Sequence, residues 1–209
     1  MKFKGIKKVH EGRFIAAYNA EYETNLGNTK IYEMSSRDHN ITSLEDLHRE
    51  KCDAVVLIIT SPDGNKLLLN KEFRMAVGGF AINFPAGLID EGETPEEAAA
   101  RELWEETGLK LTSIDEVLPM SFSGVGLTNE RSCCVIGKAE GEFAPSTSDE
   151  EEIEARWYTR EEVRELLKQR TLKTAQEESE KQQQWKELLL LDLSIVLGRS
   201  DRSLARSSE

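Results

Sequence analysis

Three glutamates that could together hold a divalent cation lie within a short segment of this 209-residue chain. Glu102, Glu105 and Glu106 follow an alanine-rich stretch and stop just before Gly108. At about 100° per residue, Glu102 and Glu106 lie about 40° apart around a helix, and Glu105 lies about 60° to the other side of Glu102. Like charges at this spacing destabilise a helix on their own, so the pattern predicts a bound cation with oxygen ligands.

The surrounding residues predict the helix that must position these carboxylates. Thr94 is suited to the N-cap, Pro95 to the first helical position, and Glu97 completes a capping box. Gly108 stands where a C-cap glycine is expected. The sequence therefore predicts one helix that begins near Thr94 and ends at Gly108.

Apolar patterning divides the chain into three regions. Residues 1–50 predict an N-terminal antiparallel strand unit, 51–170 a core, and 171–209 a C-terminal helix and polar tail. The continuous apolar run 54–60 is typical of a strand buried on both faces. The other expected elements are strands at 14–18, 30–34, 66–73, 81–84, 132–137 and 153–158, and helices at 44–48, 161–167 and 182–197.

Composition and charge exclude several functional classes. A net charge of −12 argues against general nucleic-acid binding, which needs a basic surface. No apolar run approaches the length of a membrane span, and the residues after Met1 lack the apolar core of a signal peptide. The three cysteines show neither disulfide-framework nor zinc spacing. We expect a cytoplasmic protein that contacts neither membrane nor nucleic acid.

Residues 87–109 match the Nudix box, G-x5-E-x7-R-E-U-x-E-E-x-G-U with U aliphatic, at every specified position. The chain thus resembles a Nudix hydrolase, a family that cleaves nucleoside diphosphates linked to another moiety. The resemblance implies an α/β fold, the Nudix α/β/α sandwich with a mixed sheet, beside the N-terminal antiparallel strand unit.

The resemblance also implies roles for the box residues. Glu102 and Glu106 would bind Mg²⁺, or Mn²⁺ in its place, with Glu105 as a third ligand or an outer-shell catalytic partner. In the diphosphate-sugar branch of the family, a main-chain carbonyl just before the box glycine also binds metal, and this position is Ala86. Arg101 stands four residues before Glu105, where an ion pair would orient the catalytic carboxylates.

Segments outside the box resemble the ADP-ribose pyrophosphatase group. In that group, the arginine at the position of Arg74 reaches a substrate phosphate. The segment 126–130 resembles the glycine–small polar–acidic segment of the same group, which implies that Glu130 binds substrate. The acidic loop 148–152 occupies the place of a mobile glutamate that acts as base or positions water. Either Glu151 or Glu152 fits this role.

The chain differs from this group at two positions. A glutamate usually stands where this chain has Asn83, and a proline where it has Val125. Neither position belongs to the metal helix, so the reaction is better defined than the substrate. The group also builds its site across a homodimer, which predicts that residues 1–50 pack between two subunits.

These features predict magnesium-dependent hydrolysis of ADP-ribose or a related nucleoside diphosphate sugar, a small-molecule substrate, to a nucleoside monophosphate and a sugar phosphate. One alternative is a Nudix hydrolase for another nucleoside diphosphate derivative, such as a GDP-sugar or a dinucleotide. A second is an ADP-ribose sensor that binds without cleaving. Such sensors commonly lose box carboxylates, and this chain keeps them all.

Overall fold

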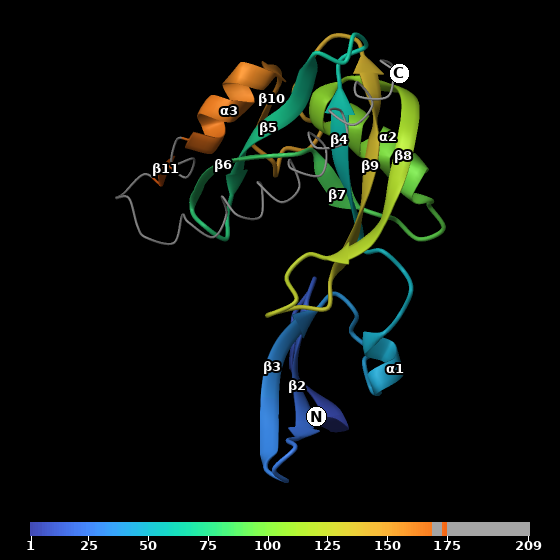
Figure 1. The fold of residues 1–209 in the computed structure, drawn as a ribbon, viewed down its shortest axis with the longest axis vertical. Coiled ribbons are helices and arrows are strands. Elements are labelled where there is room, and N and C mark those ends of the chain that lie inside the picture. The colour runs from blue at the N-terminus through green and yellow to red at the C-terminus, as the bar shows by residue number, and fades with distance from the viewer. Residues whose placement is uncertain (169–172, 175–209) are drawn as a thin grey trace, which may run out of the picture.

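The computed structural model describes residues 1–168 and 173–174, so the helix expected at 182–197 lies outside the described residues. In this part of the chain the strands form two sheets, an antiparallel N-terminal sheet and a larger mixed sheet (Figure 1). The N-terminal sheet projects away from the mixed sheet and its helices (Figure 1).

The N-terminal sheet contains β1 (Lys2–Glu11), β2 (Ala16–Glu23) and β3 (Thr29–Ser36), in that order. The expected antiparallel unit is therefore present, although β2 starts later than the apolar stretch 14–18 and the lysine-rich β1 was not expected. Ala16 and Tyr18 form a small core with Ile41. The short helix α1 (Leu44–Leu47) lies within the expected helix 44–48, and Ser43 caps it.

The mixed sheet has the strand order β11-β6-β5-β4-β9-β8, with β10 paired to β5 and β7 paired to β4. Strands β4 and β9 are parallel, and the other paired strands are antiparallel. Strands β4 and β5 meet at the pair Thr60–Leu67 and then diverge toward different neighbours. The strands are β4 (Ala54–Thr60), β5 (Lys66–Arg74), β6 (Gly79–Asn83), β7 (Ala86–Leu88), β8 (Lys110–Phe122), β9 (Arg131–Glu140), β10 (Ile153–Thr159) and β11 (Lys173–Thr174).

Helices α2 (Pro95–Thr107) and α3 (Arg160–Lys168) lie on opposite faces of this sheet (Figure 1). Leu57 of β4 belongs to the same core cluster as Leu103 of α2. The next residue, Ile58, packs in a second cluster with Val163 of α3. Strand β4 is thus buried on both faces as its apolar run predicts, and the expected α/β/α sandwich is confirmed.

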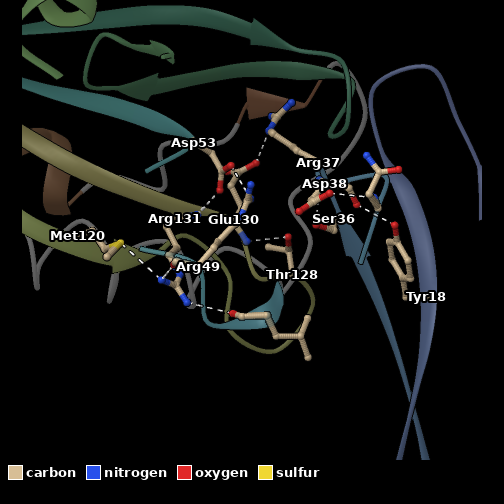
Figure 2. A network of polar contacts seen from close by, with 12 residues as sticks. Tyr18, Ser36, Arg37, Asp38, Arg49, Asp53, Met120, Thr128, Glu130 and Arg131 are labelled. Atoms are coloured by element: carbon tan, nitrogen blue, oxygen red, sulfur yellow. Dashed lines mark hydrogen bonds and ion pairs between the residues drawn. The ribbon is translucent and has the colours of Figure 1, made fainter. Parts of the chain in front are cut away.

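Polar contacts join the N-terminal sheet to the mixed sheet (Figure 2). The amide of Ser35 donates to the carbonyl of Leu127 over 2.9 Å, and Arg37 forms a 2.6 Å ion pair with Glu130. The backbone amide of Arg131 donates to Asp53 Oδ2 at 2.9 Å. Within residues 1–168 and 173–174, no helix combines the length and apolar character needed to cross a membrane.

Candidate active site

Helix α2 is fixed at both ends by the residues that the sequence predicts. Thr94 and Glu97 exchange side chain-to-backbone hydrogen bonds of 3.2 and 2.9 Å in a capping box. At the other end, Gly108 adopts a left-handed conformation with φ of 75°, and its amide donates to the carbonyl of Trp104. The buried side of the helix, which includes Leu103, packs on the sheet. This packing sets which way the neighbouring glutamates point.

Glu106 is buried between α2 and β5. Only 5% of its surface is exposed, and Asn70 of β5 donates a 2.8 Å hydrogen bond to its Oε2. Burial, and after it the nearby charge of Glu102, raises the pKa of Glu106 to about 8, against the opposing effect of the Asn70 hydrogen bond. An ionised carboxylate in this position would need a nearby positive charge to stabilise it.

Glu102 lies against the glycine that opens the box. A Cβ atom on Gly87 would stand 1.9 Å from Cδ of Glu102, so only glycine leaves room for this carboxyl group. The close approach brings the segment that contains Ala86 alongside Glu102. Burial raises the pKa of Glu102, although Arg101 opposes the shift. Glu106 is therefore a buried carboxyl group and Glu102 a half-buried one, and both resist ionisation.

Arg101 organises the loop before the helix and the third box glutamate. Its Nε and Nη2 donate to the two oxygens of Glu93 at 2.9 and 2.8 Å, and Nη2 also donates to the carbonyl of Leu88 at 2.9 Å. Its Nη1 donates to Glu102 Oε1 at 2.7 Å and to Glu105 Oε2 at 3.1 Å. The expected Arg101–Glu105 ion pair is thus present, and it turns Glu105 toward the guanidinium.

The structure does not bring the three box glutamates into one ready cation site. In the described part of the chain, no three His, Cys, Asp or Glu side chains are arranged so that they could hold a metal ion. The chemistry of the donors nevertheless fits a hard cation, because Glu102 and Glu106 supply carboxylate oxygens and burial raises the pKa of both groups. Glu105 stays a predicted third ligand or outer-shell partner, and Arg101 pairs with it at 3.1 Å and with Glu102 at 2.7 Å.

The segment just before the acidic loop docks on the C-terminal end of α2. The amides of Ala144 and Thr147 each donate over 2.9 Å to carbonyls of the last helical turn, those of Thr107 and Glu105. The charge of Glu151 contributes to the raised pKa of both Glu102 and Glu106.

Glu152 is held differently from its neighbour. Its backbone carbonyl accepts a 3.0 Å hydrogen bond from the amide of Phe73, which ties this residue to the end of β5. Of the two loop glutamates that the sequence leaves open, Glu151 is the one whose charge acts on the box carboxylates.

Two polar residues of β5 were not found by sequence reasoning. Asn70 contacts Glu106, and Glu72 is 9% exposed, accepts a 2.8 Å hydrogen bond from Asn83 and forms an ion pair with Arg74. Glu72 also contributes to the raised pKa of Glu106. The available signal was the abrupt change from leucines to polar residues in this strand.

The predicted substrate-binding residues lie in two places. Arg74 pairs with Glu72, close to the box carboxylates, and its side chain is 56% exposed. Glu130 lies at the junction with the N-terminal sheet, where it pairs with Arg37 (Figure 2). A substrate contact of Glu130 therefore stays a prediction.

The sequence is similar to a known domain family and to several known proteins. The NUDIX domain profile matches residues 50–180. An ADP-sugar pyrophosphatase of Mus musculus is 30% identical over 121 residues, which cover 58% of this chain and 53% of that protein. An ADP-ribose pyrophosphatase of Saccharomyces cerevisiae is 43% identical over 83 residues, 39% of this chain and 36% of that protein. The Homo sapiens protein named NAD-capped RNA hydrolase NUDT12 is 33% identical over 182 residues, 80% of this chain and 37% of that protein.

The chain thus spans about a third to a half of the length of these relatives. Among solved structures, an ADP compounds hydrolase superposes with a TM-score of 0.63 at 20% sequence identity. The superposition covers 81% of this chain and 84% of that chain. It shows that the two proteins share a fold.

Proposed function

The chain belongs to the Nudix family and is a Nudix hydrolase, and we propose that it hydrolyses the diphosphate linkage of ADP-ribose or a related nucleoside diphosphate sugar with the help of Mg²⁺ or Mn²⁺. The observation that carries this proposal is a pair of carboxyl groups with raised pKa values, the buried Glu106 and the half-buried Glu102, on the capped helix that follows Gly87. The names of the mouse and yeast relatives support the substrate class.

In this proposal, each residue of the site does one part of the reaction. A bound divalent cation supplies charge neutralisation on the phosphoryl oxygens. Glu102 and Glu106 would hold it, together with the carbonyl of Ala86, and Glu105 would orient the site through Arg101.

The loop and strand residues would act on water and substrate. Glu151 accepts a proton from the attacking water, since its charge already acts on the box carboxylates; Glu152 is the alternative. The water oxygen bonds to one phosphorus, and the bridging oxygen leaves with the other phosphate. Arg74 is more than half exposed, so its guanidinium can meet a substrate phosphate while Glu72 holds it from the protein side.

A dinucleotide is the second candidate substrate. The human relative that is named for NAD-capped RNA aligns with 80% of this chain, more than either the mouse or the yeast relative. NAD⁺ contains the same adenosine diphosphate linkage with a second nucleoside in place of the free sugar. The net charge of −12 favours the free dinucleotide over an RNA that carries it.

A substrate panel in isotopically labelled water tests this proposal. ADP-ribose, NAD⁺, an NAD-capped oligonucleotide and GDP-mannose would be incubated with Mg²⁺ or with EDTA, and the products identified by mass spectrometry. We expect AMP and ribose phosphate from ADP-ribose, only with the cation present, and the label shows which phosphorus the water attacks. Binding without turnover of any compound would contradict hydrolysis and favour a sensor.

We also propose that the protein is a cytoplasmic homodimer. Apolar side chains are exposed on the N-terminal sheet and on the loop beside it, including Ile31 at 44%, Val125 at 76% and Leu127 at 66%. All three cysteines are free, which suits a reducing compartment. Light scattering should report a dimer, and Leu127→Asp should shift it toward monomer; a monomer at all concentrations would contradict the dimer.

A further inference from the structure

Asn70 is a fully buried amide at the point where the apolar part of β5 ends. It follows Leu67, Leu68 and Leu69, and none of its surface is exposed. Its nitrogen donates to Glu106, whereas its Oδ1 has no hydrogen-bond partner in the described part of the chain. Burying an unpaired amide oxygen is unfavourable, so packing alone would favour another leucine here. The residue needs a different explanation.

Asn70 stands where the apolar contact between β5 and α2 gives way to the acidic site. Leu68 and Asn70 lie on the same face of β5, about 6.6 Å apart along the strand. Leu103 and Glu106 are about 4.5 Å apart along the axis of α2. Leu68 and Leu103 share one core cluster, and Asn70 and Glu106 form the next contact along the same interface.

We propose that Asn70 is a positioning residue that holds the carboxylate of Glu106 in the orientation that receives the divalent cation. The inference rests on the proposed function, in which Glu106 binds that cation. The hydrogen bond engages Oε2 of Glu106 from the strand side. A donor on one oxygen restricts rotation of the carboxylate and so fixes the direction in which the other oxygen points.

The chemistry of the two groups fixes the direction of this hydrogen bond. A carboxylate that binds a cation is ionised and only accepts, so the amide must present its nitrogen; the reversed amide would set oxygen against oxygen. Side chains that hydrogen-bond to metal-binding residues, and so orient them, commonly contribute about 10–100-fold to metal affinity. Asn70 has the burial, the donor and the partner for this role.

The test measures cation binding directly, without substrate. Mn²⁺ would be titrated into the whole protein and followed by electron paramagnetic resonance. We expect Asn70→Leu to weaken Mn²⁺ binding by about 10–100-fold. In turnover assays, the same variant should raise the Mg²⁺ concentration for half-maximal rate more than it lowers the rate at saturating Mg²⁺.

A double-mutant cycle separates a role through Glu106 from a general effect on the sheet. Asn70→Leu should have little further effect on Mn²⁺ affinity once Glu106→Gln is present. Asn70→Ala serves as a second variant, because the smaller alanine side chain avoids any clash that leucine makes at this buried position. Asn19→Leu in β2 makes the matched change in the N-terminal sheet and should bind Mn²⁺ like the wild type. Thermal unfolding of each variant confirms that it is folded.

The outcomes distinguish this inference from the proposed function. If Glu106→Gln binds Mn²⁺ as tightly as the wild type, the metal role of Glu106 fails, and the positioning role fails with it. If Glu106→Gln weakens binding but both folded Asn70 variants stay within about twofold of the wild type, only the positioning role fails. An equal loss from Asn70→Leu with and without Glu106→Gln would also overturn it.

Discussion

Glu106 combines burial with negative charge. Its exposure of 5% removes most of its hydration, and Glu102, Glu72 and Glu151 add further negative charge around it. One hydrogen bond from Asn70 offsets only part of this cost. The side chain is therefore unfavourable for the metal-free fold and is explained by the cation that it would bind.

Replacing Glu106 tests its part in the reaction. Glu106→Gln keeps the volume and removes the charge, so we expect turnover to fall by about three orders of magnitude at saturating Mg²⁺ while the fold persists. Glu96→Gln is the matched control, because Glu96 lies exposed in the first turn of the same helix. Steady-state kinetics and circular dichroism check both. An unchanged turnover number for Glu106→Gln would remove this residue from the mechanism.

The raised pKa of Glu106 also predicts how the metal-free protein responds to pH. The folded-state pKa of about 8 lies above the unfolded value of about 4.3, so the folded state binds the proton more tightly. Tighter proton binding by Glu106 in the folded state adds to the free energy of unfolding. This contribution is complete below about pH 4.3 and is lost as pH rises through about 8. The loss is on the order of a few kcal/mol.

Urea unfolding in EDTA at several pH values measures this effect. We expect the free energy of unfolding of the wild type to fall more steeply between pH 5 and pH 8.5 than that of Glu106→Gln, in the direction of the pKa shift. Glu96→Gln should follow the wild type. Parallel curves for the wild type and Glu106→Gln would show that Glu106 ionises in the folded protein as it does in water.

At the scale of elements, the approach of β7 to α2 controls where Glu102 points. Gly87→Ala would place a Cβ atom 1.9 Å from Cδ of Glu102. The carboxyl group is the free end of a flexible side chain, so it can move aside, and we expect stability within about 1 kcal/mol of the wild type. Cation affinity should fall by about tenfold or more, because the ligand is displaced.

Gly5→Ala provides the control for this substitution. Its added Cβ would meet no atom within 4 Å, so both stability and Mn²⁺ affinity should stay at wild-type values. Thermal unfolding and Mn²⁺ titration of the two variants make the comparison. Wild-type Mn²⁺ affinity in Gly87→Ala would mean that the position of Glu102 does not govern cation binding.

Elements with local signals were predictable from the sequence. Strand β4 follows its apolar run, and α2 follows the capping residues Thr94 and Gly108. Strand β8 was not predictable, because it is mostly exposed, contains Pro119 and has three register irregularities against β9. Strand β1 is likewise exposed and rich in lysine. Strands β1 and β8 form because they pair with neighbouring strands. The sequence of a strand does not show which strand it will pair with.

The same limit applies within the candidate site. Helical spacing predicts that Glu102, Glu105 and Glu106 share one face, and they do lie on consecutive turns of α2. Spacing does not reveal that Arg101 draws Glu105 aside, or that Glu106 meets Asn70, which is 36 positions away in the sequence. Those contacts depend on how β5 packs against the helix.

At the scale of the whole molecule, Arg131 of β9 holds the segment that joins the N-terminal sheet to the mixed sheet (Figure 2). Its guanidinium donates to the carbonyl of Leu47 at 3.0 Å and to that of Arg49, and it lies 4.9 Å from the ring centre of Phe122. Arg49 in turn pairs with Asp53 at 2.5 Å. The connecting segment 47–53 is thus held by one buried arginine.

Arg131→Leu should release this connecting segment. The substitution leaves two carbonyls without their charged donor, which we expect to cost about 2 kcal/mol at the junction. The segment contains Arg49 and Lys51, so trypsin should cut there more than about tenfold faster than in the wild type. Arg156→Leu is the matched control, since Arg156 lies 3.9 Å from the ring centre of Tyr158 at the far side of the mixed sheet. Equal cleavage rates in Arg131→Leu and Arg156→Leu would show that other contacts, such as the Arg37–Glu130 pair, hold the two sheets together.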